Sequence, residues 1–130
     1  LESFVWPDHV DRKAQLPASI AAARHDTPRL TRRAAADWLA EQLAAPATGV
    51  ATVVFHSIMW WYLSEDERQR VTATIGAAGA RATPDAPLAW LRLEICGSLK
   101  AELRITQWPD GAEQTLARAD AHGRWVTWLA

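Results

Sequence analysis

The chain of 130 residues has a single cysteine and no long apolar run, and each shortage excludes a class of protein. The lone thiol, Cys96, excludes an intramolecular disulfide, and a reducing cytoplasm is the simplest compartment. No stretch of about 18 or more apolar residues occurs, so we expect no membrane-spanning segment. No basic segment followed by an apolar one opens the chain, so we expect no export signal.

Several motifs of well-known enzymes are also missing. No Gly-x-Ser-x-Gly elbow occurs, which argues against a serine hydrolase. No Gly-x-Gly-x-x-Gly or Walker loop occurs, so nothing is built to hold a phosphate. Metal binding is not expected, because the chain has one cysteine and its histidines lack ligand spacing. Those histidines are His9, His25, His56 and His122.

The charge balance argues against a nucleic-acid or anionic-membrane partner, which requires a basic field. The net charge is −1 and the isoelectric point is about 6.5. Hydrophobic content of 49% and charged content of 22% are ordinary for one globular domain, which we expect to span residues 1–130. Because the first residue is Leu1 rather than Met, we expect an excised piece of a longer protein. Most of the eight tryptophans are expected in or beside the core.

Helical patterns occupy the first third of the chain. Asp8 can cap a helix that extends to Arg24, and Pro17 either kinks it or starts a second helix. Residues 34–45 predict a strong helix that is rich in Ala, Leu and Glu. Its apolar face comprises Trp38, Leu39 and Leu43.

The middle of the chain predicts a strand–helix–strand unit. The segment from Ala51 to Ser57 is predicted to be a buried strand. The apolar run Val50–Phe55 is typical of a central strand that is covered on both faces. A short helical turn over residues 58–63 precedes a helix from Ser64 to about Ala78, with Gly79 as its stop. Ser64 and Glu67 form a predicted capping box. The next strand is 88–95, and such a unit implies a parallel pair with a right-handed crossover.

The last third predicts further strands at residues 101–108, 115–119 and 125–129. The short link after Ile95 cannot cross over, so these strands add antiparallel as a hairpin or meander. Pro109-Asp110-Gly111 is a predicted turn, and the segment 122–125 is predicted to be a tight turn between strands. The fold class is therefore α/β, with parallel core strands flanked by helices and an antiparallel C-terminal part.

Polar side chains end the two predicted parallel strands, where open sheets bind ligands. These are His56 and Ser57 on the first strand and Glu94 on the second, beside the aromatic residues 60–62. A histidine with a carboxylate can act in general acid–base catalysis. In the competing interpretation, His56 only bonds a loop and Ser57 only caps the following turn.

Several segments resemble a bacterial family catalogued as domain of unknown function 2332. The segments are Trp6-Pro7, the Val-Val-Phe-His-Ser run that ends at Ser57, Tyr62-Leu63, the run from Pro87 to Glu94, Trp108-Pro109-Asp110-Gly111 and His122-Gly123-Arg124-Trp125. Members of this family are typically much longer, so the resemblance implies that this chain is their C-terminal portion. The C-terminal half of the family is similar to the latter part of a class I S-adenosylmethionine-dependent methyltransferase fold. The resemblance implies a Rossmann-like partial sheet, in which His56 and Ser57 end a strand that faces cofactor and substrate.

The resemblance does not supply a cofactor for this chain. The glycine-rich loop of such methyltransferases is absent, so no cofactor is expected here, whereas S-adenosylmethionine is expected only for a longer parent. The short link after Ile95 also departs from these enzymes, which place a helix there.

Two hypotheses for function follow, and the sequence does not decide whether the protein is an enzyme. The first is a methyltransferase-like domain, active or degenerate, with candidate catalytic residues His56, Ser57 and Glu94. The second is a non-enzymatic binding or scaffold module that uses a Trp-rich surface. We expect the partner to be a small molecule or a protein, with no nucleic acid and no membrane, and a homodimer through an exposed sheet edge is one arrangement.

Overall fold

The computed structural model describes residues 5–27, 29–97 and 100–129, and the chain separates into two compact units. The first unit spans residues 1–32 and the second spans residues 33–130. The single domain expected from the sequence stays a prediction.

The first unit contains one helix, α1 (Val10–His25), which continues through Pro17. The structure therefore has one helix here and not two. Its N-cap is His9, without a side-chain cap, so the predicted start at Asp8 was wrong. Pro17 has no N–H to donate to the carbonyl of Lys13, which leaves the helix weaker at that turn. No residue of α1 is buried within the structure.

The second unit contains eight further elements in the predicted order. They are α2 (Ala35–Gln42), β1 (Thr52–Ser57), the 3-10 turn η2 (Trp60–Tyr62), α3 (Glu65–Gly79), β2 (Leu88–Ile95), β3 (Lys100–Trp108), β4 (Ala112–Asp120) and β5 (Val126–Trp128). The predicted bounds of β2 match, β3 begins one residue earlier than predicted, and the predicted fourth strand proves longer at both ends.

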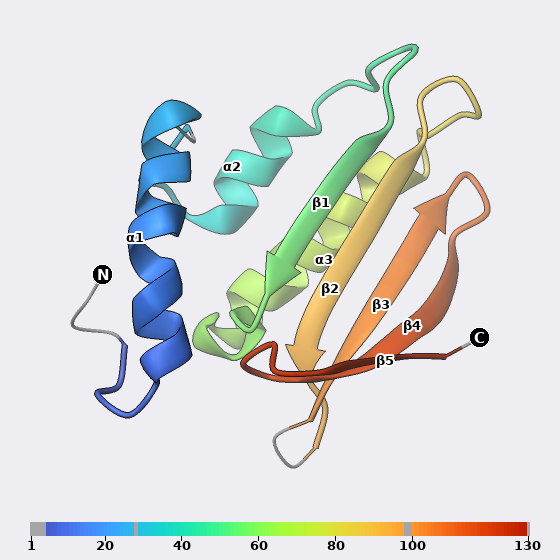
Figure 1. Ribbon diagram of the computed structural model, residues 1–130. Helices are drawn as coiled ribbons and strands as arrows, with labels where there is room; N and C mark the ends of the chain where they lie inside the picture. The colour runs from blue at the N-terminus through green and yellow to red at the C-terminus, as the bar shows by residue number, and fades with distance from the viewer. Residues whose placement is uncertain (1–4, 28, 98–99, 130) are drawn as a thin grey trace. The chain divides into compact units, whose positions relative to one another are not determined.

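The five strands form one open sheet in the order β1-β2-β3-β4-β5. β1 runs parallel to β2, with α3 as the crossover between them, and all later pairs are antiparallel (Figure 1). The mixed α/β class is confirmed. The sheet is nevertheless mostly antiparallel, because the described residues contain a single strand–helix–strand unit and the later connections are too short to cross over.

The prediction that β1 is a central strand covered on both faces was wrong. β1 ends the strand order, and Val53 and Phe55 are 57% and 59% exposed. Residues 52, 54 and 56 are half-buried on the other face, so the strand alternates strictly. An apolar run predicts that a strand can be buried on both faces, but within the structure only β2 pairs with β1.

The helices α2 and α3 pack on one face of β2 and share a small core. Buried members of this core are Ala36, Leu39, Leu43, Val71, Ile75, Leu88 and Trp90. Leu39 and Leu43 face the core as predicted, whereas Trp38 is 39% exposed. The apolar stripe of α2 is narrower than its sequence suggests, because Trp38 lies outside the core and the buried position one turn before Leu39 is the small Ala36.

The start of α3 follows the predicted cap, with one difference. The Ser64 hydroxyl accepts a hydrogen bond from the Glu67 N–H at 3.2 Å, as the capping box requires. The Glu67 carboxylate instead accepts from the Ala36 N–H of α2 at 2.9 Å. Because Ala34 cannot cap α2 with a side chain, Glu67 supplies the missing acceptor from the neighbouring helix.

Gly79 was predicted to stop α3, but it belongs to the helix and does not adopt a positive φ. Packing explains the glycine at this position instead. A Cβ at this position would lie 2.4 Å from the Trp108 indole, so only glycine lets this ring pack on the helix. The predicted turns are confirmed, because Gly111 and Gly123 adopt φ values of 71° and 75° at the ends of β3 and β4.

The turn between β4 and β5 is fastened by Asp120. Its carboxylate accepts from the His122 N–H at 2.9 Å and from the Arg124 guanidinium at 2.8 Å. The guanidinium of Arg124 and these backbone donors hold the pKa of Asp120 well below its usual range. These hydrogen bonds hold the segment 122–125 as a structural turn.

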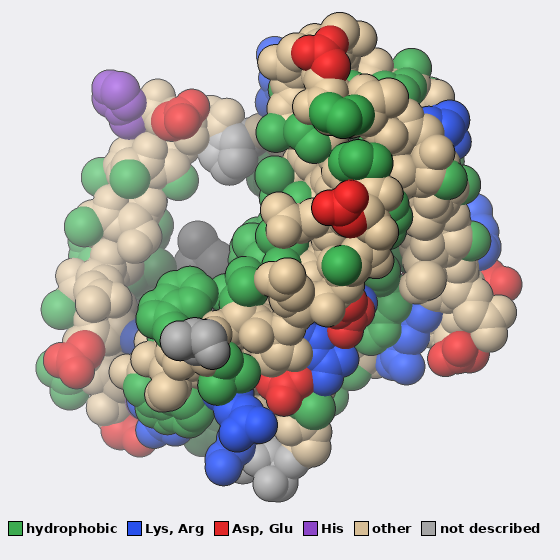
Figure 2. Space-filling view, turned by 90° about the vertical axis from the view of Figure 1, so that its right-hand side faces the viewer, with side chains coloured by type: hydrophobic (Ala, Val, Ile, Leu, Met, Phe, Trp, Pro, Cys, Tyr) green, Lys and Arg blue, Asp and Glu red, His purple; other side chains and the backbone are tan. Residues whose placement is uncertain are grey.

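The tryptophans are less buried than predicted. Trp90 is the buried one, Trp60 and Trp108 are half-buried, and the remaining five are exposed within the structure. Figure 2 shows acidic and basic side chains lying beside one another on one face of the molecule, as expected from the near-zero net charge. None of the described helices is long and apolar enough to cross a membrane.

Candidate functional site

The carboxyl ends of β1 and β2 bring His56 and Glu94 together. In the parallel register His56 lies opposite Arg92, and Glu94 follows two residues later on the same face of β2. His56 Nδ1 and Glu94 Oε1 are 2.7 Å apart, and their side chains are only 11% and 19% exposed. Two residues 38 positions apart in the chain therefore form a shielded His–Glu pair.

Glu94 also holds the turn that follows β1. Its carboxylate accepts from the backbone N–H groups of Met59 at 3.2 Å and Trp60 at 3.3 Å. The preceding residue, Ile58, adopts a positive φ of 50°, which is costly for a β-branched side chain. The hydrogen bonds from the two backbone N–H groups to Glu94 stabilise this strained turn. The turn and the orientation of His56 therefore depend on the same carboxylate.

The hydrogen bond between His56 and Glu94 determines which ring nitrogen of His56 can accept a hydrogen bond from a ligand. A carboxylate only accepts hydrogen bonds, so His56 donates through Nδ1–H, and in the neutral ring Nε2 becomes the acceptor. Nε2 is buried and has no hydrogen-bond partner among the described residues. A buried acceptor without a partner costs about 1–3 kcal/mol, so a water or ligand group that donated to it would be favourable.

Aromatic rings enclose His56 on two sides. Trp60 stacks on the imidazole with centroids 5.1 Å apart and planes 15° apart, and the Trp90 ring lies 5.9 Å away. The Arg92 guanidinium lies 4.1 Å above the Trp90 ring, in cation–π geometry. Trp90 Nε1 and Arg92 Nε are buried and, like His56 Nε2, have no partner among the described residues.

These side chains line a cavity of about 320 Å³, which lies within the size range of small-molecule sites. Further lining comes from Thr72 of α3, Ile95 and Cys96 after β2, and Glu102 and Arg104 of β3. Arg104 Nε donates to Glu102 at 2.9 Å, and this guanidinium holds the pKa of the Glu102 carboxyl below its usual range. The charges of Glu102 and Arg104 therefore neutralise each other within the lining of the cavity.

The other residue predicted for this site, Ser57, is not brought to it. Ser57 follows His56 on β1, is exposed, and lies on the opposite face of the strand, opposite Leu93 in the register. It does not line the cavity. Cys96 does line the cavity, and its sulfur lies 3.7 Å from Arg104 Nη2.

Four charged or aromatic residues of the lining were not proposed as site residues from the sequence: Trp90, Arg92, Glu102 and Arg104. Trp90 and Arg92 share a strand face with Glu94, so the two-residue period of β2 was the signal for both. Glu102 and Arg104 lie opposite Glu94 and Arg92 in the β2–β3 register. That register depends on the hairpin, and its exact alignment is not readable from the residue pattern.

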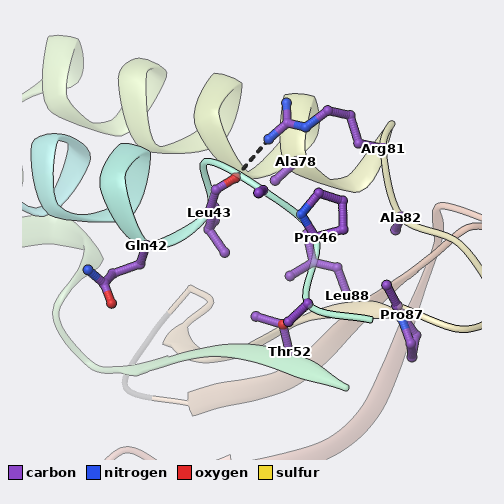
Figure 3. A pocket seen from close by; sticks show the side chains of 12 residues that line it. Gln42, Leu43, Pro46, Thr52, Ala78, Arg81, Ala82, Pro87 and Leu88 are labelled. Atoms are coloured by element: carbon purple, nitrogen blue, oxygen red, sulfur yellow. Dashed lines mark hydrogen bonds between the residues drawn. The ribbon is translucent and has the colours of Figure 1, made fainter. Parts of the chain in front are cut away.

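The amino ends of β1 and β2 form a second, much smaller hollow of about 60 Å³. Thr52 and Leu88, the first residues of these strands, line it together with Leu43 and Pro46 (Figure 3). Arg81 crosses its rim and donates to the Leu43 carbonyl at 2.7 Å and to the Ala77 carbonyl at 2.9 Å. No side chain that lines this hollow has a buried polar atom without a partner.

Comparisons with known proteins give one match. Among curated proteins and among solved structures, no protein matches the chain. In the described part of the chain, no group of three or more His, Cys, Asp or Glu side chains could hold a metal ion. A family model matches residues 1–128, and its description is an uncharacterized protein conserved in bacteria. With nearly its whole length matched, the chain belongs to this bacterial family, DUF2332.

Proposed function

We propose that the cavity at the carboxyl ends of β1 and β2 binds a small molecule and that His56 accepts a proton, or a hydrogen bond, from its O–H or N–H group. The observation that carries this proposal is the His56–Glu94 pair, 2.7 Å long, with a buried Nε2 that has no partner among the described residues. The large majority of buried side-chain polar atoms have a hydrogen-bond partner, so the unpartnered Nε2 favours a role beyond structure.

The roles of the two side chains follow from their hydrogen bonds. When Nε2 takes a proton from a bound hydroxyl or amine, the ring becomes an imidazolium and the ligand becomes a better nucleophile. The Glu94 carboxylate stabilises that imidazolium and holds the ring in place. Trp60 and Trp90 exclude water, which strengthens both effects.

S-adenosylmethionine does not fit the residues of this chain. The two carboxylates that line the cavity are engaged, Glu94 by His56 and two backbone N–H groups, and Glu102 by Arg104. Neither is free to receive ribose hydroxyls, and no glycine-rich loop follows a strand. Methyl transfer therefore stays a proposal for a longer protein that supplies the cofactor site from other residues, as does the Rossmann-like relationship itself.

A second candidate function is recognition of a partner by exposed aromatic side chains. Trp61 and Tyr62 are 58% and 78% exposed, with ring centroids 5.5 Å apart. They follow Trp60 in η2, directly beside the candidate site. Exposed tryptophan and tyrosine pairs are typical of binding surfaces, so these rings could contact a ligand or protein without any chemistry at His56.

One experiment separates the two candidates. Small alcohols, amides and heterocycles are added to the protein, and the indole N–H resonances of Trp90 and Trp61 are followed by NMR. The cavity proposal predicts shifts at Trp90 that disappear in the His56→Gln variant, while the indole of Trp128 serves as the internal control. Shifts confined to Trp61 would favour surface recognition, and no shift at Trp90 with any compound would overturn the cavity proposal.

A further inference from the structure

Three residues that line the cavity carry buried polar atoms without partners among the described residues, and donors outnumber acceptors among them. Trp90 Nε1–H and Arg92 Nε–H are donors without partners among the described residues, and His56 Nε2 is an acceptor without one. All three side chains lie on the same face of adjacent strands, with the rings of His56 and Trp90 5.9 Å apart and Arg92 directly over Trp90. A matching ligand needs an acceptor for the two donors and, beside it, a donor for His56.

The charges of the cavity favour an uncharged ligand. Arg92 forms an ion pair with Glu113 and donates to Thr106, and Arg104 pairs with Glu102. Glu94 is satisfied by His56 and by backbone N–H groups. Because no cation or carboxylate among these residues lacks a counter-charge or donor, an ionic ligand would bring an unmatched charge into a shielded site.

We propose that the ligand is a neutral, flat heterocycle with a lactam edge, that is, a ring carbonyl next to a ring N–H. The carbonyl oxygen accepts from Trp90 Nε1–H and Arg92 Nε–H, and the adjacent N–H donates to His56 Nε2. The inference rests on the proposed function, because it uses His56 Nε2 as the acceptor. It adds the chemical class of the molecule.

The lining of the cavity also suits a planar ring. Trp60 and Trp90 present indole surface to the cavity, and aromatic side chains favour flat, polarisable partners over saturated ones. The volume of about 320 Å³ accommodates a single ring with a substituent. Three hydrogen bonds from one ring edge would satisfy three buried polar atoms at once, which favours this class over a lone alcohol or a hydrocarbon.

Three related probes test the class with the full chain. Uracil carries the lactam edge on a flat ring, 1,3-dimethyluracil keeps the ring and carbonyls but lacks N–H, and 5,6-dihydrouracil keeps the edge on a saturated ring. Binding is measured by calorimetry and by the shift of the Trp90 indole N–H. We expect uracil to bind best, 1,3-dimethyluracil about tenfold or more weaker, and dihydrouracil several-fold weaker.

A variant locates the effect within the cavity. Trp90→Phe keeps an aromatic ring and removes one donor, so uracil binding should weaken roughly tenfold. If this variant does not fold, the comparison of uracil with 1,3-dimethyluracil on the unmodified protein still decides. Equal affinity for these two compounds, or no binding of uracil, would overturn the inference. If other fragments still shift Trp90 through His56, the proposed function survives that failure; if none does, both fail.

Discussion

The two ends of the parallel pair β1–β2 differ in how completely their polar groups are satisfied. At the amino end, Arg81 donates to two carbonyls, and the hollow of about 60 Å³ is lined mainly by Ala, Pro and Leu. At the carboxyl end, the cavity is about 320 Å³ and three buried polar atoms lack partners among the described residues.

This difference separates stability from function within one small sheet. Where every buried polar group has a hydrogen-bond partner, the fold is stabilised and no donor or acceptor remains for a ligand. Buried polar groups without partners lower the stability of the fold, and proteins keep them at sites where a ligand binds. The strained Ile58 and the shielded His56–Glu94 pair both lie at the carboxyl end of the two strands, where buried polar atoms lack partners. Substitutions at the amino end should therefore change stability alone, and those at the carboxyl end should change binding.

The largest expected effect is on stability, at the amino end. Leu43 is buried in the core beside the small hollow, so Leu43→Ala should lower the free energy of unfolding by about 2–5 kcal/mol. Urea denaturation followed by circular dichroism measures this loss. In the fraction that remains folded, ligand shifts at the Trp90 indole should be unchanged; loss of these shifts would break the proposed separation of the two ends.

The next effect concerns Glu94, which should matter for both stability and binding. Glu94→Ala leaves His56 and two backbone N–H groups without their acceptor, so it should cost about 1–3 kcal/mol and abolish ligand shifts at Trp90. Glu65→Ala is the matched control on α3, since its carboxylate is exposed. Unchanged ligand shifts in Glu94→Ala would contradict the role of Glu94 in positioning His56.

A smaller effect is expected for Arg81 at the amino end. Arg81→Met removes two hydrogen bonds to backbone carbonyls at a partly exposed position, so we expect a loss of about 1 kcal/mol. Thermal denaturation measures it, and calorimetry should find ligand binding unchanged. A larger change in binding than in stability would show that the two ends are coupled.

Trp90→Phe should leave stability within about 1 kcal/mol of the wild type, because the lost ring area is offset by removal of an unsatisfied N–H. The same substitution should weaken ligand binding. If urea denaturation shows that the variant loses several kcal/mol of unfolding free energy, Trp90 Nε1 has a structural partner. The carboxyl end of β1 and β2 would then not hold an unsatisfied donor at Trp90.

The smallest effect is a pH dependence at the wall of the cavity. Arg104 lowers the pKa of Glu102 in the folded state, so this group stabilises the fold above its unfolded pKa of about 4.3. That contribution is lost as the pH falls through the lowered folded pKa. The difference in Tm between wild type and Glu102→Gln should therefore shrink below about pH 4. A difference that grows with acidity would contradict the assignment.

The sequence predicted the elements of the second unit well because their signals are local. The Ser64 cap, the alternation of β2 and the turn at Gly111 each depend on a few neighbouring residues. The exposure of β1 was not predicted, because an apolar run does not reveal which strands flank it. Proline usually destabilises the interior of a helix, so a kink or a second helix was predicted at Pro17, yet α1 continues through it.

The candidate site was predictable in part, for the same reason. His56 and Glu94 end adjacent parallel strands, so their meeting follows from topology. The partners that give the site its chemistry required more than topology. Arg92 lies over Trp90, and Glu102 is placed by the hairpin register, and neither the rotamers nor that register are encoded in a short pattern.

The proposed function depends above all on which ring nitrogen of His56 carries the proton. The ¹⁵N chemical shifts of its ring nitrogens, assigned by their absence in His56→Gln, report which nitrogen carries the proton. In the neutral imidazole we predict a proton on Nδ1, bonded to Glu94, and none on Nε2. In Glu94→Gln the population should shift toward Nε2–H. A proton on Nε2 in the wild type would contradict the account, because the cavity would then have no acceptor at His56.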